Sequence, residues 1–369
     1  MRSDIEVIYD ANFAINQHRG MGKYINNFVS VLRDNIGLQT LGLLKTGTKI
    51  VSSEDEYYSF GLSIYILWEQ FSMYFFTSKF EGLVIYPYNT STIFLRKSSK
   101  NVLIIHDLIY FNNSKNQSLR QKVGSTYRRF VVPRIINKFE HIITVSEYSK
   151  QQLLNRFNLD ENMINVIPNS VIFNKLDVNL NPKYNERGNY ILHIGGEPSY
   201  KNSKSLLYAF SKLPDHIKKI YKVKMIGIRD NKVLRQYQSI ANELGIIEAI
   251  EFLPYQSDVQ INNLYKNAKM FIFPSFDEGF GIPIIESFKF GCPLLCSYSS
   301  CFPEIAGNAA RYFDPNDKNS IASAIVSTIV EKEQTILKIE LGYRQLEKYS
   351  ADMFVENVKS WYAKSFEKS

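Results

Sequence analysis

Two glutamates near position 280 have the side-chain type and the surroundings to bind a sugar or a phosphorylated ligand. The segment FIFPSFDEGFGIPIIESFKFGCPLL, from Phe271, predicts a buried strand ending at Ser275, a loop, and a helix with Pro283 in its first turn. Glu278 then lies in the loop and Glu286 one turn into the helix. Backbone N–H groups at a helix start suit phosphates and sugar hydroxyls. The placement of the two glutamates, more than their spacing, therefore indicates a ligand site.

The strand before Glu278 belongs to a repeating strand and helix pattern. The first half of the chain contains the apolar runs IEVIYDANF, LGLL, GLVIYPY, NVLIIHDL, HIITVS and NVIP. The second half contains NYILHIGG, KVKMIGI, IEFLPY, KMFIFPS, PLLCSYS and ARYFDP. Such runs are typical of parallel sheets covered by helices on both faces. We therefore predict the α/β class, with two Rossmann-like, doubly wound domains whose strand carboxyl ends face a central cleft.

The length of 369 residues exceeds what one hydrophobic core usually fills, which favours two domains. A polar stretch containing Pro182 and Gly188 separates the two sets of strands and predicts a linker. The final helix has one apolar face, and we expect it to pack back toward the N-terminal domain. We predict four parts: an N-terminal domain over 1–172, a linker over 173–188, a second domain over 189–349 and a C-terminal helix over 350–369.

No apolar run is long enough to cross a membrane. The nearest, GLSIYILWEQFSMYFF from Gly61, is interrupted by Glu69 and Gln70, and we predict a buried helix there. Charged residues occupy the N-terminus, where a signal peptide would need apolar ones, which favours a cytoplasmic location.

The formal charge of +8 is unevenly distributed. Between Arg96 and Lys138, ten basic residues accompany one acid, Asp107, so ten minus one gives a local charge of +9. Two interpretations stay open. The stretch binds an anionic partner such as nucleic acid, lipid or a phosphorylated acceptor, or it is the solvated face of a long helix.

The segment FPSFDEGFGIPIIES resembles the signature of family 4 of the retaining glycosyltransferases, which have the GT-B fold. HRGMGKYINNF, IIHDLIY, IITVSEYSKQQLL and INVIPNSV are similar to N-terminal motifs of that family. ILHIGGEPSYKNSKSLLYAF, IEFLPYQSDVQINNLYKNAKMFIFPS and CFPEIAGNAARYFDP resemble its donor domain, so the resemblance covers nearly the whole chain. It implies an N-terminal domain that binds the acceptor and a second domain that binds a nucleotide sugar.

The resemblance also implies roles for the residues around the two glutamates. Glu286 would hold the ribose hydroxyls of the nucleotide, since a carboxylate accepts several hydrogen bonds. Glu278 would face the transferred sugar and counter positive charge in an oxocarbenium-like transition state. The backbone amides of Phe280, Gly281 and Ile282 would bind sugar hydroxyls or the diphosphate.

Further implied contacts lie elsewhere in the chain. Lys201 would neutralise the departing diphosphate, and Gly195 would belong to the donor site. Gly20 and Gly22 would let the backbone approach the diphosphate, and His106 would contact the sugar from the opposite wall. For each a structural alternative stays open: a surface lysine at a helix start, a satisfied core histidine, or glycines that only form turns.

One position departs from the family pattern. Many relatives have Arg just before the lysine of the motif, whereas this chain has Tyr200 before Lys201. Either another cation near the diphosphate replaces the missing one, or the site binds phosphate more weakly. The candidate cations are Arg19, Lys23 and Arg229.

The sequence also favours a reaction without a metal ion or other cofactor. It has no Asp-x-Asp pair, which metal-dependent GT-A glycosyltransferases use to hold a divalent cation. The resemblance implies retention of configuration, and we expect a same-face displacement in which the leaving phosphate takes the acceptor's proton.

The resemblance leaves donor and acceptor open. We expect a nucleotide sugar as donor, first GDP-mannose and otherwise dTDP-rhamnose or a UDP-hexose. The expected acceptor is a glycan or a lipid-diphosphate-linked glycan in surface polysaccharide synthesis. The basic stretch Arg96–Lys138 would then bring the protein to the inner face of the cell membrane, with basic and aromatic residues of one helix sharing a face: Tyr127, Arg128, Arg129, Phe130, Val131, Arg134 and Lys138.

Two other functions are compatible with parts of the sequence. A sugar-nucleotide 2-epimerase of GT-B shape would share the cleft, and free nucleotide released only with an acceptor would argue against it. A non-catalytic protein could use the basic stretch to bind nucleic acid or lipid. The chain contains no recognisable nucleic-acid module, so we expect no nucleic-acid partner.

Overall fold

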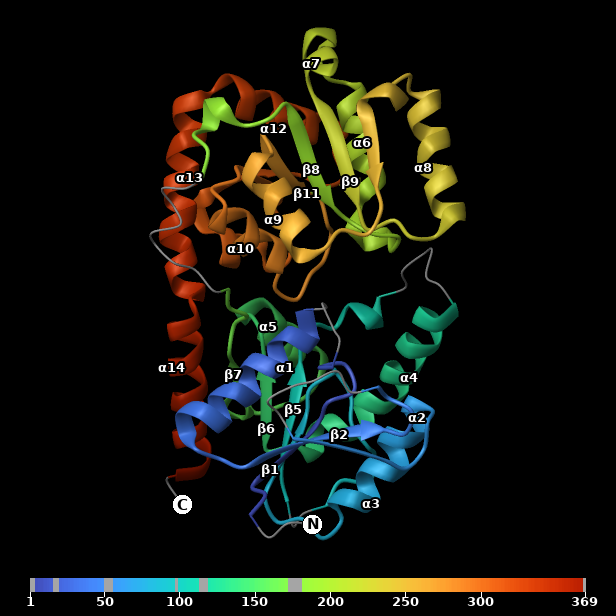
Figure 1. Ribbon diagram of the computed structural model, residues 1–369, viewed down its shortest axis with the longest axis vertical. Helices are drawn as coiled ribbons and strands as arrows, with labels where there is room; N and C mark the ends of the chain where they lie inside the picture. Colours follow the sequence, from blue (N-terminus) through green and yellow to red (C-terminus); the bar gives the residue numbers. More distant parts are fainter. Residues whose placement is uncertain are drawn as a thin grey trace. The chain divides into compact units, whose positions relative to one another are not determined.

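The computed structural model describes residues 4–15, 20–49, 56–96, 99–112, 119–171 and 181–367. Figure 1 shows the chain coloured from its N-terminus in blue to its C-terminus in red. The chain divides into two compact units. The N-terminal unit comprises Met1–Asn112, Gln121–Ser170 and Asp352–Ser369, and the C-terminal unit comprises Asn113–Arg120 and Val171–Ala351. Within the described residues, no helix combines the length and apolarity that a membrane crossing requires.

The N-terminal unit contains a parallel sheet of seven strands in the order β3-β2-β1-β4-β5-β6-β7. Residues of β1 pair on both sides, since Val7 is in register with Thr40 of β2 and Leu83 of β4. The strand order therefore reverses between β1 and β4. The strands are β1 Val7–Asp10, β2 Thr40–Lys45, β3 Tyr57–Phe60, β4 Leu83–Tyr86, β5 Lys100–Ile105, β6 His141–Thr144 and β7 Ile164–Val166.

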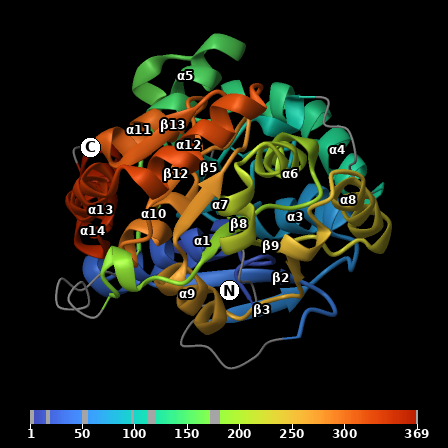
Figure 2. The same ribbon diagram turned by 90° about the horizontal axis from the view of Figure 1, so that it is seen from above.

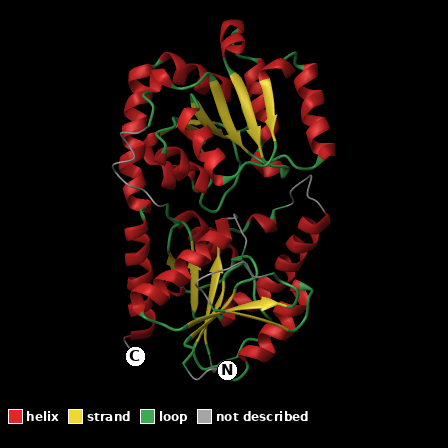
Figure 3. Ribbon diagram, viewed as in Figure 1, coloured by secondary structure: helices red, strands yellow, loops and turns green. Residues whose placement is uncertain are grey.

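Helices cover this sheet on both sides (Figure 3). Their buried faces meet the sheet in a core that includes Ile8, Val84 and Leu103. The main helical segments are α1 Gly20–Ser30 with the π-helical turn η1 Val31–Ile36, α2 Tyr65–Leu67, the π-helical turn η2 Trp68–Ser72, α3 Met73–Thr77, α4 Leu119–Ile135, α5 Glu147–Arg156 and α14 Ala351–Tyr362.

The segment from Gly61, predicted as a buried helix, is helical over α2, η2 and α3 but only half buried. Trp68 and Met73 are fully buried on one side, whereas Phe71 and Phe75 are exposed on the other. The prediction of a buried helix was therefore wrong for one face. Both faces carry large apolar side chains, and the buried one also holds Glu69 and Gln70, so hydrophobicity alone did not distinguish the face that packs from the face that meets solvent.

Aromatic contacts hold α14 in the N-terminal unit. The ring of Phe354 lies 5.5 Å from that of Tyr24, and Trp361 lies 5.3 Å from Phe28. Both Tyr24 and Phe28 belong to α1. Offset and edge-on aromatic pairs stabilise such contacts beyond the burial of their area. The last helix of the chain thus packs on the first.

The C-terminal unit contains a six-stranded parallel sheet in the order β10-β9-β8-β11-β12-β13. The order reverses at β8 and β11, which are neighbours, with Ile191 in register with Met270. The same elements are seen from above in Figure 2. The strands are β8 Tyr190–Ile194, β9 Lys222–Ile226, β10 Ile250–Leu253, β11 Met270–Phe273, β12 Leu294–Ser297 and β13 Ala310–Phe313. The helices are α6 Ser203–Ser211, α7 Asp215–Ile220, α8 Asn231–Glu243, α9 Asp258–Asn267, α10 Ile282–Lys289, α11 Phe302–Ala306, α12 Lys318–Val330 and α13 Lys332–Leu346.

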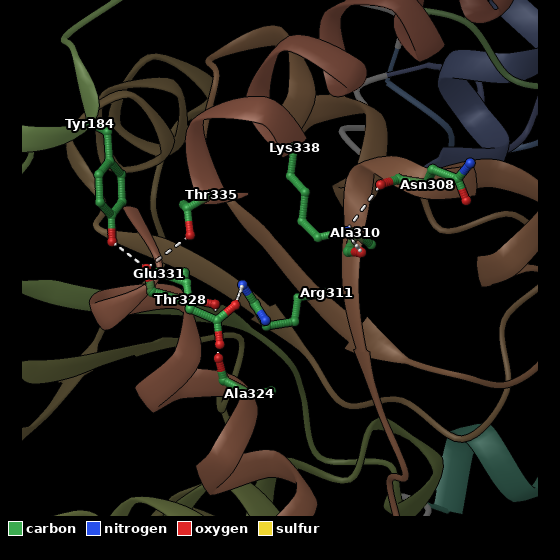
Figure 4. Close-up of polar contacts among 9 residues, drawn as sticks. All are labelled: Tyr184, Asn308, Ala310, Arg311, Ala324, Thr328, Glu331, Thr335 and Lys338. Carbon is green, nitrogen blue, oxygen red and sulfur yellow. Dashed lines mark hydrogen bonds and ion pairs between the residues drawn. The ribbon is translucent and has the colours of Figure 1, made fainter. Parts of the chain in front are cut away.

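Residues 173–180 of the predicted linker lie outside the described residues, and residues 181–188 pack into the C-terminal unit. The hydroxyl of Tyr184 donates to the carbonyl of Thr328 at 2.6 Å, and Thr335 donates to the same carbonyl at 3.0 Å (Figure 4). Nearby, Lys338 caps the carbonyl of Ala310 at 2.9 Å, and Arg311 pairs with Glu331 at 2.9 Å (Figure 4). These bonds fix the corner between α12 and α13.

Candidate donor site

The strand reversal of the C-terminal unit brings together two predicted site residues. The loop after β8 carries Lys201 and the loop after β11 carries Glu278, 77 residues later. The Nζ atom of Lys201 lies 2.7 Å from Oε1 of Glu278, and the two side chains are 21% and 12% exposed. Since open parallel sheets bind ligands outside the carboxyl ends of strands where the order reverses, this ion pair lies where a ligand is expected.

Tyr200 supports this pair in place of a second cation. Its backbone carbonyl accepts a hydrogen bond of 2.7 Å from the amide of Phe276, which ties the loop after β8 to the loop after β11. The Nζ atom of Lys201 lies 5.4 Å from the centre of the Tyr200 ring and 5.5 Å from that of Phe273. Aromatic faces attract an ammonium group at this distance. The residue that replaces the family Arg therefore contributes to positioning the lysine.

The predicted glycine turn and helix follow β11 as expected. Gly281 has a φ of 84° and is the N-cap of α10, a left-handed conformation that favours glycine. A Cβ atom there would also lie 3.1 Å from side-chain atoms of Ile284 and Phe302. Ile282 begins the helix, and Phe280 is buried with its ring 5.4 Å from that of Tyr349. The turn is thus rigidly packed on both sides.

Glu286 lies on α10 and contacts a buried tyrosine. The hydroxyl of Tyr265, on α9, donates to Oε2 of Glu286 at 3.3 Å. Burial, together with the charge of Glu286, raises the pKa of Tyr265 well above its ordinary value. The hydroxyl therefore stays protonated and acts as a donor that orients the carboxylate.

Gly195 lies at the end of β8, where a side chain would not fit. A Cβ atom there would collide with the imidazole of His193 and the hydroxyl of Ser203, which are bonded to each other at 2.8 Å. The carbonyl of Ile272, in β11, faces the other ring nitrogen of His193 at 3.0 Å. Burial lowers the pKa of His193 to about 4, so the ring is neutral at pH 7. Close packing beneath the site thus requires Gly195.

Of the three alternative cations, Arg229 lies on the same sheet edge. It follows β9, the neighbour of β8, and its guanidinium lies 5.4 Å from the Tyr255 ring. Oε1 of Glu197 accepts hydrogen bonds from the backbone amides of Arg229 and Asp230 at 3.0 and 2.7 Å, which fixes the loop after β9. The side chain of Arg229 is exposed.

The other predicted residues around the first helix belong to the N-terminal unit. Gly20 begins α1, Gly22 is buried within it, and Lys23 is exposed on it. Arg19 lies outside the described residues. The contribution of α1 to a donor site stays a prediction.

His106 follows β5 and is buried. Its Nε2 atom lies 3.0 Å from the carbonyl of Pro87, and its amide donates to Oδ1 of Asn89 at 2.6 Å. Its ring stands edge-on to Tyr24 at 5.0 Å. Burial lowers its pKa to about 4, so the ring is neutral and Nε2 carries the proton that it donates to Pro87. These are the contacts of a satisfied histidine, and a role toward sugar stays a prediction.

Sequence comparisons identify the family. Residues 180–338 match the glycosyl transferases group 1 family, and residues 86–174 match Glycosyltransferase Family 4. The O-antigen chain mannosyltransferase RfbU of Salmonella typhimurium is 30% identical over 263 residues, which are 71% of this chain and 69% of that protein. The chain belongs to the family 4 glycosyltransferases. The predicted family is thereby confirmed.

One further relative and one solved structure place this glycosyltransferase among known proteins. The O-antigen chain mannosyltransferase B of Escherichia coli is 30% identical over 220 residues, or 57% of this chain and 56% of that protein. Sucrose-phosphate synthase from Thermosynechococcus elongatus has a TM-score of 0.77 at 15% identity, over 99% of this chain and 100% of that one. This structural likeness shows the fold alone, and it confirms the predicted GT-B class.

The structure reveals an acidic pair in the glycosyltransferase that the sequence did not single out. Asp10 ends β1 and Glu69 lies in η2, at the reversal between β1 and β4. The hydroxyl of Tyr65 lies 2.8 Å from Oδ2 of Asp10 and 3.0 Å from Oε1 of Glu69. The Tyr65 hydroxyl has one proton and donates it to only one of the two carboxylates. Its contact with the other requires a proton on the carboxyl group of Asp10 or Glu69.

Burial explains how a carboxyl group keeps that proton. Asp10 and Glu69 are 2% and 1% exposed. Burial raises the pKa of Asp10 to about 6 and that of Glu69 to about 7, although hydrogen bonds from Asn12 and Tyr127 oppose the shifts. Asp10 and Glu69 lie far from each other in the sequence, and no local motif marks either of them.

Within the described residues, no group of three or more acidic, histidine or cysteine side chains could hold a metal ion.

We expect the Lys201–Glu278 pair to be energetically coupled, because both side chains are largely buried. Lys201→Met and Glu278→Gln, singly and together, give a double-mutant cycle from urea unfolding. Its coupling energy should be about 1 kcal/mol or more. The control is the more exposed pair Lys224–Glu251, separated by 3.5 Å in the same unit, which should give less than about 0.5 kcal/mol. Equal coupling in the two pairs would contradict the assignment.

We expect Glu69 to make stability depend on pH with a defined sign. Its folded pKa of about 7 exceeds the ordinary 4.5, so its favourable contribution is complete below pH 4.5 and is lost as pH rises toward 7. A pKa difference of one between the folded and unfolded protein corresponds to about 1.4 kcal/mol. Glu69→Gln should therefore gain stability relative to the wild type between pH 4.5 and 8. Urea unfolding that shows parallel pH profiles for the two proteins would contradict this.

Proposed function

We propose that this glycosyltransferase moves a hexose from a nucleotide sugar to a hydroxyl group of a glycan acceptor, with retention of configuration and without a metal ion. The Lys201–Glu278 ion pair carries the proposal, because it lies at the strand reversal beside the helix start at Gly281. This edge offers a cation and a helix N-terminus, which suit a diphosphate, and carboxylates, which suit the hydroxyl groups of a sugar and a ribose.

The nucleotide would be held by Glu286 and the diphosphate by Lys201. A carboxylate accepts bonds at two oxygens, so Glu286 can hold the Tyr265 hydroxyl and the ribose hydroxyls together. Lys201 gains a second anionic partner when the diphosphate arrives. Arg229, on the same sheet edge, is the alternative cation that the C-terminal unit itself supplies.

Glu278 would act on the transferred sugar. Its contact with Lys201 fixes the carboxylate in position to accept a hydrogen bond from a ring hydroxyl and to offset the positive charge that develops at the anomeric carbon. In the proposed same-face displacement, the bond from anomeric carbon to phosphate oxygen breaks while the acceptor oxygen bonds to that carbon on the same face. The acceptor's proton passes to the leaving phosphate oxygen.

GDP-mannose is the first candidate donor, because two relatives at 30% identity are named O-antigen chain mannosyltransferases. dTDP-rhamnose and UDP-hexoses follow. The acceptor would be a glycan or a lipid-diphosphate-linked glycan of a surface polysaccharide. These nucleotide sugars can be compared by the thermal stabilisation that each gives. A ligand at a hundred times its Kd adds about 2.7 kcal/mol to the free energy of unfolding.

We expect transfer from the stabilising donor to survive excess EDTA, because Lys201 and a helix N-terminus supply the positive field that a metal would otherwise provide. The assay follows labelled sugar entering the acceptor fraction after dialysis against chelator. Activity that disappears and returns with magnesium or manganese would contradict the metal-free proposal.

We expect Glu286 and Glu278 to affect different steps. Glu286→Ala should weaken nucleotide binding by about 1.5 to 3 kcal/mol, the value of hydrogen bonds to a charged group. Glu278→Gln should lower turnover more than nucleotide affinity. Calorimetric titration and initial rates separate the two, with the exposed Glu340→Ala as a control that changes neither. Unchanged affinity in folded Glu286→Ala, or equal losses of turnover and affinity in Glu278→Gln, would refute the assigned roles.

A further inference from the structure

A row of large apolar side chains faces solvent along one helical segment of the N-terminal unit. The segment runs through α2, η2 and α3, which are continuous from Tyr65 to Thr77. Ile64, Leu67, Phe71 and Phe75 are 61%, 40%, 46% and 69% exposed. Spacings of four residues place Leu67, Phe71 and Phe75 on one face of the helical segment, opposite the buried Trp68 and Met73, and Ile64 precedes them as the extended N-cap of α2.

The row continues onto a neighbouring loop. Phe94 is 53% exposed, and its ring lies 5.7 Å from that of Tyr74, which in turn lies 5.4 Å from Phe75. We call Ile64, Leu67, Phe71, Phe75 and Phe94 the apolar stripe. Single exposed apolar residues are ordinary on protein surfaces, but a contiguous row marks an interaction site.

Basic side chains border the apolar stripe. The guanidinium of Arg96 donates to the Tyr74 hydroxyl at 2.7 Å and lies 5.0 Å from its ring. Lys138 donates to the carbonyl of Ile93, next to Phe94, at 2.9 Å. Arg134 lies 3.6 Å from the centre of the Phe130 ring, which is itself exposed. We call Arg96, Arg134 and Lys138 the basic border.

Few acids balance these cations. Residues 121–138 contain none, and described residues 56–96 contain Glu56, Glu69 and Glu81, of which Glu69 is buried. Helices α2, α3 and α4 lie on one side of the N-terminal unit (Figure 1), and Gln70 of η2 donates to the Tyr127 hydroxyl of α4. This bond lies on the buried side of the segment. The stripe and the border meet instead at Phe94, where Arg96 bonds to Tyr74 and Lys138 bonds to Ile93, and Arg134 precedes Lys138 by four residues.

The structure corrects which residues of α4 share this surface. Arg129 does not face outward with the others, because its guanidinium holds the carbonyls of Tyr110 and Asn112. Val131 is buried, and Tyr127 bonds to Glu69. The predicted interfacial face was therefore wrong for Tyr127, Arg129 and Val131, whereas its members Phe130, Arg134 and Lys138 are exposed as predicted.

We propose that the apolar stripe and the basic border together form a docking surface for an anionic lipid bilayer. Apolar side chains enter the boundary between headgroups and acyl chains, while Lys and Arg at their edge meet anionic headgroups. A second copy of the chain fits less well, because a two-fold interface would bring each basic border near another of the same sign. That this surface serves to reach a lipid-linked acceptor rests on the proposed function. Its docking on a bilayer does not.

Co-sedimentation of the full chain with phosphatidylcholine vesicles, with and without phosphatidylglycerol, tests the proposal. The stripe variant is Leu67→Ser with Phe71→Ser and Phe75→Ser. The border variant is Arg96→Gln with Arg134→Gln and Lys138→Gln. The matched control replaces Ile220, Val259 and Val330 by Ser, since these residues are 52%, 78% and 67% exposed in the C-terminal unit. Thermal unfolding verifies that each variant folds.

The wild type and the control should bind phosphatidylglycerol vesicles equally, and the stripe variant about tenfold or more weakly. The border variant should lose the preference for phosphatidylglycerol. Wild-type protein that ignores anionic vesicles, or a stripe variant that binds them as well as the control, overturns the proposal. A wild-type dimer in light scattering that the stripe variant converts to monomers overturns it in favour of self-association. Transfer to a water-soluble acceptor, unchanged in the stripe variant, separates this result from the proposed function.

Discussion

The reversal of strand order between β8 and β11 is the constraint on which the candidate donor site depends. Because neighbouring parallel strands end at the same sheet edge, their loops meet although they are distant in sequence. This places Lys201 against Glu278 at 2.7 Å and starts α10 beside them. Gly195 and Gly281 follow from the same constraint, since the loops at this edge pack too closely, or turn too sharply, for a side chain.

The N-terminal unit uses its own reversal differently. At the ends of β1 and β4 it buries Asp10 and, from η2, Glu69, linked by one tyrosine hydroxyl. Burial raises the pKa values of Asp10 and Glu69, so this pair retains a proton near neutral pH, whereas the C-terminal site contains an ion pair. The two sheets thus share a topology but present different chemistry at corresponding edges.

Local sequence patterns predicted the elements and the fold class, because buried parallel strands and glycine turns are set by residues close in sequence. They also predicted the glycine turn before the helix that carries Glu286. The pairing of Lys201 with Glu278 and of Asp10 with Glu69 could not be predicted, since each pair is formed by topology. The exposed face of Phe71 and Phe75 was missed because an apolar side chain on a helix does not reveal whether another element covers it.

Hydrogen–deuterium exchange with and without the donor that stabilises the protein most tests the central claim directly. If the nucleotide sugar binds at the reversal between β8 and β11, amides of residues 195–202 and 275–286 should gain protection, because these loops carry Lys201, Glu278 and Glu286. Unchanged exchange in both segments at saturating donor, with protection elsewhere in the C-terminal unit, would contradict it.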